Sequence, residues 1–214
     1  MTRAPHLALP PADLDAHALP LSTLKRGTEV FRSHAVDRHP IWFGPGPGRR
    51  PEYRFDAPGG EYGVCYVGRS EMAAFVETFF RDLPIRVVSR GNLELRAIST
   101  IRLTRSVRVV RVYGAALVRL GATSAVGGAK LVVPPAFSAQ PYEHSQAWSA
   151  ALHDHPAAPH GIQYRSSHDD KLLCVALFED RAADVLELAA QGGPLSDDKS
   201  FLAHAIRRYG VRLL

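Results

Sequence analysis

The order of its short apolar segments constrains the fold of this chain most. Strand-like runs and helix-like runs follow one another without a steady strand–helix–strand alternation. The strand-like runs are 29–32, 62–68, 84–90, 93–99, 106–113, 161–164, 172–178 and 211–214, and the helix-like runs are 71–82, 114–120, 142–153, 182–190 and 198–209. A regular alternation would predict a parallel, doubly wound sheet, so its absence predicts an α+β fold.

One segment has the clearest helical pattern. Ser70 is a good N-cap, and Glu71 follows it at the positive end of the helix dipole. Apolar side chains then recur with spacings of three and four residues, at Met72, Phe75, Val76, Phe79 and Phe80. This spacing predicts an amphipathic helix with one buried face.

A long segment from residue 39 to residue 60 contrasts with these regular runs. It contains the glycine- and proline-rich stretches 44–48 and 58–60, which disfavour helices and strands. Long loops in compact domains often carry function, so we expect this segment to rim a binding site. Residues 1–24 are predicted to form an extended, proline-punctuated lead-in to a single domain over residues 25–214.

Composition excludes several classes of protein. The chain has 214 residues, of which 46% are hydrophobic and 22% charged, so it is not a disordered tail, a collagen-like fibre or a coiled coil. Two cysteines, Cys65 and Cys174, lie in apolar runs and are expected to be small buried hydrophobes. We expect a cytoplasmic protein with no membrane association, because no signal peptide or apolar span of about 20 residues is visible.

The excess of basic residues is almost entirely arginine. Lysine and arginine total 26 against 21 acidic residues, and 22 of the 26 are arginine. Arginine binds phosphate and carboxylate through a planar fork, which leaves nucleic acid, a nucleotide or an acidic protein open as partner. The densest run, 90–111, lacks interleaved aromatic residues and would spread its arginines over both faces of a strand, so direct nucleic-acid binding is not expected.

Local catalytic and metal-binding motifs are missing from the sequence. There is no P-loop, no dinucleotide-binding glycine motif, no nucleophile elbow and no paired-cysteine or zinc-protease motif. The triplets 153–155 and 168–170 combine histidine with aspartate and suggest metal ligands. A spacing of two residues does not place two ligands on one helix face, so we expect no metal site.

The order and spacing of several sequence blocks nevertheless resemble the RES-domain family, named for its Arg, Glu and Ser. The resemblance runs from about Leu24 to the C-terminus. The blocks are RGTEVFRSH (26–34), WFGP (42–45), RFDAPGGEYGVCYVG (54–68), AAFVET (73–78), YGAALVRLGA (113–122), QAWSAALHDHP (146–156) and GIQYRSSHD (161–169). No single block is specific, whereas their joint order is.

The resemblance implies a fold, an activity and a partner. The fold would be α+β and ADP-ribosyltransferase-like, with a mixed or antiparallel sheet, flanking helices and an NAD⁺ cleft. The activity would be destruction of NAD⁺ by phosphorolysis or hydrolysis, as the toxin of a bacterial toxin–antitoxin pair. NAD⁺ would be a substrate, with inorganic phosphate as a co-substrate, and no cofactor is expected. The partner would be an antitoxin with a helix-turn-helix region that covers the cleft, and a homodimer or a larger complex is implied.

The resemblance also assigns residues of this chain to roles. The catalytic residues would be Arg32, Glu77, Ser166 and Tyr66, and Arg54 would lie near the NAD⁺ pocket as a second basic residue. Apart from the resemblance, we expect His34, Phe43 and Tyr164 to bind NAD⁺ as well. Many relatives have arginine after the family serine, whereas this chain has Ser167. If that arginine helps to bind an anion, affinity or partner choice would differ here.

The chemistry of NAD⁺ cleavage explains why such residues would be needed. The nicotinamide leaving group is already cationic, so it needs no general acid, while the ribose becomes oxocarbenium-like. The carboxylate of Glu77 could stabilise that charge and bind the 2′-hydroxyl. Arg32 could hold the pyrophosphate through two hydrogen bonds, and Tyr66 could stack on nicotinamide or orient the ribose.

Each of these residues also has a purely structural interpretation. Glu77 would be a solvated helix residue and Arg32 a solvated strand end, Tyr66 a core tyrosine, Ser166 a turn residue, His34 a structural histidine, and Phe43 an anchor of its loop. The sequence also leaves two other functions open, namely ADP-ribosyl transfer to a protein and a non-enzymatic basic module with a vestigial cleft. It does not distinguish water from phosphate as the acceptor.

Overall fold

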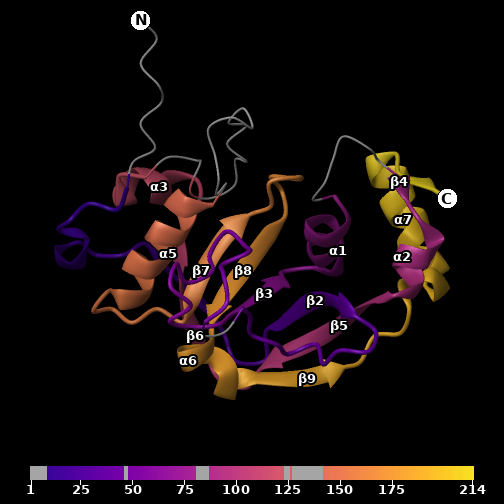
Figure 1. Ribbon diagram of the computed structural model, residues 1–214, viewed down its shortest axis with the longest axis horizontal. Helices are drawn as coiled ribbons and strands as arrows, with labels where there is room; N and C mark the ends of the chain where they lie inside the picture. The colour runs from indigo at the N-terminus through magenta and orange to yellow at the C-terminus, as the bar shows by residue number, and fades with distance from the viewer. Residues whose placement is uncertain (1–8, 46–47, 81–86, 123–125, 127–141) are drawn as a thin grey trace, which may run out of the picture.

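The computed structural model describes residues 9–45, 48–80, 87–122, 126 and 142–214, and a mixed eight-stranded sheet organises them (Figure 1). Its strands are β1 (Leu21–Leu24), β2 (Glu29–Ala35), β3 (Val64–Gly68), β5 (Arg96–Leu103), β6 (Val107–Arg111), β7 (Gly161–Arg165), β8 (Leu173–Phe178) and β9 (Leu186–Ala190). The strand order is β1-β6-β7-β8-β3-β2-β5-β9, with β6 and β7 parallel and the other neighbours antiparallel. The prediction of an α+β fold is confirmed.

Helices flank this sheet. They are α1 (Glu71–Phe79), α2 (Arg90–Glu94), α3 (Ala115–Leu120), α5 (Glu143–Asp154), α6 (Glu179–Ala182) and α7 (Lys199–Tyr209), with short 3₁₀ turns at Leu14–Ala16, Ala183–Val185 and Leu195–Asp197. A second, two-stranded parallel sheet pairs β4 (Val87–Val88) with β10 (Arg212–Leu213). It joins the C-terminal end of the chain to the segment before α2.

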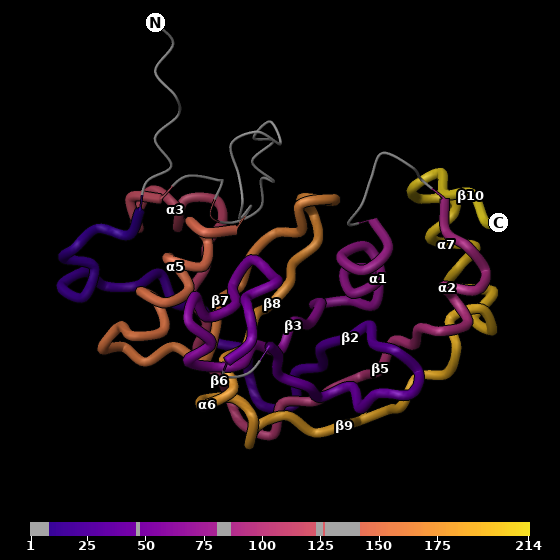
Figure 2. The backbone as a smooth tube through the Cα atoms, viewed as in Figure 1, coloured from indigo at the N-terminus to yellow at the C-terminus, as the bar shows by residue number. Residues whose placement is uncertain are grey.

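The large sheet opens between β2 and β3. These strands pair only at Phe31 and Gly68, whereas β2 pairs with β5 along its whole length, from Glu29–Arg102 to Ala35–Arg96. In Figures 1 and 2, β7 and β8 run upright while β2, β5 and β9 run across the view. The sheet therefore changes direction at β3, and β2 diverges from β3 beyond their single pair.

The predicted helix after residue 70 is confirmed as α1. The Ser70 side chain caps it by accepting a hydrogen bond of 3.2 Å from the backbone N–H of Ala73. Met72, Phe75 and Val76 are buried in the core, as the apolar spacing requires. Gly68 allows the helix to start directly after β3, because a Cβ there would lie 2.6 Å from the backbone nitrogen of Ala74.

The sheet separates two clusters of buried side chains. On one face, Phe75 of α1 and Trp148 of α5 belong to the larger cluster. On the other face, Val30, Cys65 and Ile101 belong to the smaller one. Cys65 and Cys174 are both buried, as expected, and neither is part of a disulfide bond.

Some predicted elements are wrong. Residues 186–190 form strand β9, not part of a helix, because they pair with β5 at the edge of the sheet. Residues 90–94 form helix α2. The predicted strands 84–90 and 93–99 both extend into this helix, so their adjoining ends are wrong. Residues 84–86 of a predicted strand lie outside the described residues. The division into a lead-in over residues 1–24 and a domain over residues 25–214 stays a prediction. The last four residues of the lead-in form β1, which pairs with β6.

Candidate active site

A cavity of about 710 Å³ lies where β2 diverges from β3. Residues of β2, β3 and α1 line it, together with residues of the loop between β2 and β3 and of the segment after β7. Its volume is in the range of small-molecule and cofactor pockets. Five arginines line it, namely Arg32, Arg38, Arg49, Arg54 and Arg96, against two glutamates, Glu52 and Glu77. The excess of positive charge favours an anionic ligand.

Polar atoms without partners gather at this cavity. Within the described part of the chain, five buried side-chain nitrogen or oxygen atoms lack a hydrogen-bond partner, and three of them belong to cavity residues: Ser33 Oγ, Arg54 Nη1 and Glu77 Oε1. Buried polar groups are nearly always hydrogen-bonded, because an unmade bond costs about 1–3 kcal/mol. A concentration of such atoms beside one cavity therefore indicates that a ligand or ordered water completes their bonds.

Glu77 lies on α1, and its charge acts on Cys174 of β8. Burial raises the pKa of the Cys174 thiol well above its usual value, and the negative charge of Glu77 raises it further, while Arg54 opposes the rise. Cys174, Glu77 and Arg54 all line the cavity. The carboxylate of Glu77 and the guanidinium of Arg54 thus both act on the Cys174 thiol at the cavity.

Arg54 enters the cavity from the loop before β3. The residue is 9% exposed, and its guanidinium carbon lies 5.5 Å from the ring centre of Tyr164. Tyr164, on β7, is itself buried and packs against Phe55 with ring centres 4.9 Å apart. The described residues give Arg54 no carboxylate partner within ion-pair distance, so its charge remains available to a ligand.

The turn that carries Arg54 is held by buried side chains. Asp56 is fully buried, and its Oδ2 accepts hydrogen bonds of 2.8 Å and 2.7 Å from the backbone N–H groups of Glu52 and Tyr53. From α5, Ser149 donates to the carbonyl of Phe55 at 2.7 Å, and Gln146 donates to the carbonyl of Tyr53 at 2.9 Å. Burial raises the pKa of Asp56, although these N–H donors oppose the rise.

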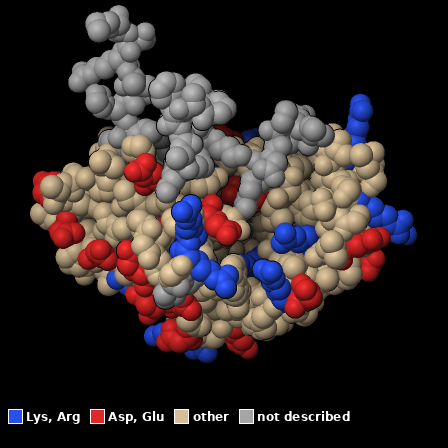
Figure 3. All heavy atoms as spheres, in the orientation of Figure 1, with Lys and Arg blue, Asp and Glu red and all other residues tan. Residues whose placement is uncertain are grey.

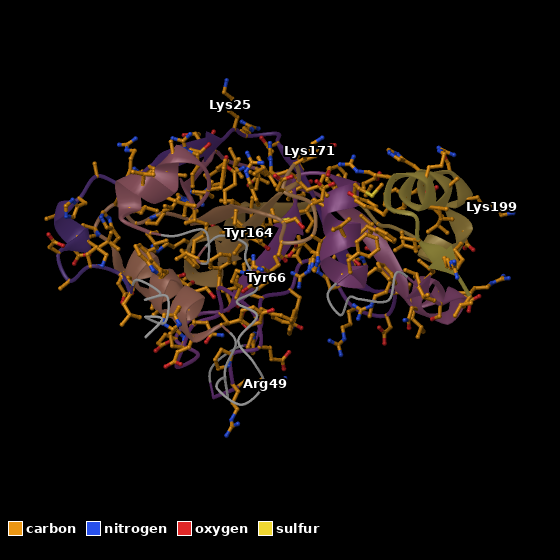
Figure 4. The ribbon with its side chains drawn as sticks, turned by 90° about the horizontal axis from the view of Figure 1, so that it is seen from above. Lys25, Arg49, Tyr66, Tyr164, Lys171 and Lys199 are labelled. Carbon is orange, nitrogen blue, oxygen red and sulfur yellow. The ribbon has the colours of Figure 1, made fainter. Side chains whose placement is uncertain are left out.

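The hydroxyl of Tyr66 belongs to the same network. It donates to Asp56 Oδ1 at 2.9 Å and accepts from the backbone N–H of Phe55 at 2.8 Å. Burial, the nearby charge of Asp56 and the hydrogen bond to it raise the pKa of Tyr66 well above its usual value. The hydroxyl is thus used within the protein. Figure 4 shows Tyr66 and Tyr164 near the middle of the molecule, and Arg49 far out on the loop.

Arg32 approaches the cavity from the opposite face of β2. Its Nη1 donates to the backbone carbonyl of Trp42 and to Cys65 Sγ, and its guanidinium carbon lies 5.7 Å from the Trp42 ring centre. Arg32 shares its strand face with Val30, whereas Ser33 lies on the face covered by α1. Arg32 and Glu77 therefore reach the cavity from different faces of the sheet, across the gap between β2 and β3.

The residues around this cavity match a known protein family. A family model described as the RES domain matches residues 29–201, a range that includes β2, β3, α1 and every residue of the cavity lining that the structure describes. The chain belongs to the RES domain family. No curated protein and no solved structure matches the chain.

Six of the eight predicted site residues of this RES domain line one cavity: Arg32, His34, Arg54, Tyr66, Glu77 and Tyr164. His34 is buried, and both its ring nitrogens are engaged, Nδ1 with the carbonyl of Ala35 and Nε2 with Ser99 Oγ, each at 2.8 Å. Its contacts are those of the structural histidine that the sequence left open.

Ser166 and Phe43 are not among the residues that line the cavity. Ser166 Oγ accepts a hydrogen bond of 3.1 Å from the backbone N–H of His168, and the residue is 4% exposed. The neighbouring Ser167 and His168 do line the cavity. Phe43 packs against the smaller core cluster, whereas the adjacent Trp42 lines the cavity. Catalysis by Ser166 and NAD⁺ binding by Phe43 remain predictions.

Sequence reasoning missed Ser33 and Asp56. Alternation along β2 was a usable signal for Ser33, since it points to the opposite side from Arg32 and His34. For Asp56 the signal was an acidic residue between Phe55 and Ala57, both of which are buried. Neither signal identifies a site unless the neighbouring strands and helices are placed.

The histidine–aspartate triplets of the RES domain make ordinary structural contacts. His153 stacks on Tyr62 with ring centres 4.0 Å apart and contacts the carboxylates of Asp154 and Asp180. Asp169 accepts hydrogen bonds of 2.7 Å from Arg208 and Tyr209 of α7. Over the described ranges, no group of three or more histidine, cysteine, aspartate or glutamate residues is placed to hold a metal ion.

Charged side chains of both signs are visible on one face of the molecule (Figure 3). Figure 3 shows basic side chains gathered near the middle of the face in view, with acidic side chains around them.

Of the helices that the structure describes, none has the length and apolar content that a membrane crossing needs.

Proposed function

We propose that this RES domain cleaves the nicotinamide–ribose bond of NAD⁺. Membership of the family supports a function connected with NAD and with toxin–antitoxin pairs at the level of the family. The observation that carries the proposal for this chain is the gathering of Glu77 Oε1 and Arg54 Nη1, both buried and unpartnered among the described residues, at one arginine-rich cavity. A dinucleotide offers the ribose hydroxyls and the pyrophosphate that such groups bind.

In this proposal the basic residues and the acidic residue have different roles. Arg54, with Arg32 on the other side of the gap, binds the pyrophosphate through charge-assisted hydrogen bonds. Glu77 accepts a hydrogen bond from the 2′-hydroxyl and stabilises the positive charge that develops on the ribose as nicotinamide departs. The bond between C1″ and the pyridinium nitrogen breaks with its electron pair going to nicotinamide, so no proton has to be supplied to the leaving group.

Tyr66 contributes its ring. Because its hydroxyl is bonded to Asp56 and Phe55, it presents an aromatic surface, against which nicotinamide stacks. Tyr164 contributes in the same way from β7, beside Arg54. An ADP-ribosyltransferase-like fold belongs to this proposal and is supported by the mixed sheet with a cavity where it opens.

The acceptor is water or inorganic phosphate, and the product tells them apart. Purified protein is incubated with NAD⁺, with and without phosphate, and the products are read by mass spectrometry. Phosphorolysis gives nicotinamide and ADP-ribose-1″-phosphate, hydrolysis gives ADP-ribose, and transfer to protein gives a mass increase on the chain or an added protein. NAD⁺ that stays intact after long incubation overturns the enzymatic proposal and leaves a non-enzymatic basic module.

The proposed biological role is the toxin of a toxin–antitoxin pair. Production of the chain alone should arrest growth and lower cellular NAD⁺, and coproduction of a partner that covers the cavity should prevent both effects. The proposed partner carries a helix-turn-helix region, and a homodimer or a larger complex is part of the same proposal. Normal growth and unchanged NAD⁺ during production of soluble, folded chain would contradict the toxin role.

A further inference from the structure

Ser33 lies at the point where the sheet opens. It is two residues beyond Phe31, the only residue of β2 that pairs with β3 within the described chain. Its strand partner on β5 is Ile98, which packs against the core cluster that contains Phe75 and Val76 of α1. Ser33 is therefore on the face of β2 that α1 covers, and it lines the cavity.

The hydroxyl of Ser33 is not used by the described part of the chain. Its Oγ is buried and, within the described chain, makes no hydrogen bond. A serine hydroxyl is both a donor and an acceptor, and it rotates to reach a partner where one exists. An unsatisfied hydroxyl beside a cavity therefore marks a place where an external group completes the bond.

Two buried serines near the cavity, Ser99 and Ser166, differ from Ser33. Ser99, which pairs with Arg32 on the opposite face, is bonded to His34 and accepts a hydrogen bond of 2.9 Å from the backbone N–H of Gly192. Ser166 accepts from the backbone N–H of His168. The hydroxyls of Ser99 and Ser166 are thus used to hold the fold, whereas that of Ser33 makes no hydrogen bond to a described residue.

We propose that Ser33 is a ligand-binding residue whose hydroxyl hydrogen-bonds the nicotinamide–ribose half of NAD⁺. This inference rests on the proposed function. The half is chosen by position, because Ser33 lies under α1, the helix that carries Glu77, and on the same side of the sheet as that helix. The ribose hydroxyls and the carboxamide of this half offer both donors and acceptors to a serine.

The test separates binding from stability. In a Glu77→Gln background, which prevents consumption of NAD⁺, isothermal titration calorimetry gives the Kd for NAD⁺ with and without Ser33→Ala. We expect Kd to rise on the order of threefold to tenfold, the effect of losing one net hydrogen bond. The Tm without NAD⁺ should stay unchanged or rise, because Ser33→Ala removes no hydrogen bond to a described residue.

Ser99→Ala in the same background is the matched control. It removes a hydroxyl with two partners, so Tm should fall while Kd changes less than in Ser33→Ala. The inference on Ser33 is overturned if Ser33→Ala binds NAD⁺ as tightly as its parent, or if its Tm falls as far as that of Ser99→Ala. A Glu77→Gln parent that gives no binding signal with NAD⁺ overturns the proposed function and this inference together, so the two failures are distinguishable.

Discussion

At the scale of single residues, the candidate site is defined by what its polar atoms lack. Ser33, Arg54 and Glu77 each keep a buried atom without a partner among the described residues, and all three line the same cavity. Leaving such atoms unpaired costs stability, which is typical of groups held ready for a ligand. The resemblance to the family predicted Glu77 and Arg54 as site residues. Whether their polar atoms lack hydrogen-bond partners depends on the folded surroundings and has no sequence pattern.

Glu77→Gln should abolish NAD⁺ loss while the fold survives. Glutamine keeps the shape but removes the negative charge at an oxocarbenium-like centre, so the rate should fall about a hundredfold or more. Because Oε1 has no partner among the described residues, Tm should not fall by more than a few degrees. The rate of NAD⁺ loss and the thermal melt of the same preparation check this, and near-full turnover would show that the role given to Glu77 is wrong.

Tyr66→Phe should affect stability more than chemistry. It removes the donor to Asp56 and the acceptor for the Phe55 N–H, so unfolding free energy should fall by about 1–3 kcal/mol. The ring remains, and kcat should stay within a few-fold of the parent. Denaturant melts and steady-state kinetics measure the two effects.

A matched control for this variant is Tyr113→Phe. Tyr113 donates a single 3.2 Å hydrogen bond to Gln163, so its loss of stability should be smaller. If Tyr66→Phe instead keeps its stability and loses its turnover, the Tyr66 hydroxyl takes part in the reaction, contrary to our interpretation.

At the scale of elements, the sequence correctly predicted a helix whose pattern of apolar and capping residues lies within one short segment. Helix α1 follows from its apolar spacing and its Ser70 cap, both of which lie between Ser70 and Phe80. Residues 186–190 were predicted wrongly because leucine, glutamate and alanine favour helices, whereas pairing with β5 makes the segment an edge strand. Pairing partners distant in the chain decided that outcome.

A contact between α7 and the turn after β7 joins two elements at the cavity rim. Asp169 accepts hydrogen bonds from Arg208 and Tyr209, and its neighbour His168 lines the cavity. Burial alone would raise the pKa of Asp169, but these hydrogen bonds outweigh burial and lower it. Burial and the bond to Asp169 raise the pKa of Tyr209 to about 12.

Tyr209→Phe should therefore remove a pH-dependent stabilisation. The protonated hydroxyl is favoured in the folded state, so its contribution is complete below the ordinary tyrosine pKa of 10.0 and is lost as pH rises through about 12. The Tm difference between the parent and the variant should shrink over that interval. A difference that stays constant across it would show that Tyr209 stabilises α7 by packing alone.

At the scale of the whole molecule, the opening of the sheet places the cavity. The α+β class follows from the order of segments, but the single pair between β2 and β3 cannot be read from the chain, because it depends on how two distant strands meet. The sequence also placed Arg32 and Glu77 in one site without indicating that they reach it from opposite faces. That arrangement requires a gap in the sheet, which only the assembled strands show.

The charge of the cavity predicts a salt effect on binding. Five arginines against two glutamates attract an anionic dinucleotide, and dissolved salt screens the attraction. The KM for NAD⁺ should rise with ionic strength while kcat stays nearly constant. Steady-state kinetics over a series of sodium chloride concentrations measure both, and a fall in kcat at constant KM would place the effect on chemistry instead of binding.

The cavity's cations are arginines, with no lysine among the lining residues that the structure describes. Guanidinium stays protonated throughout the physiological pH range. Lysine acetylation, which neutralises many anion sites, has no target there. Acidity and acetylation therefore cannot discharge this site, and an effective inhibitor has to occupy the cavity or block its entrance.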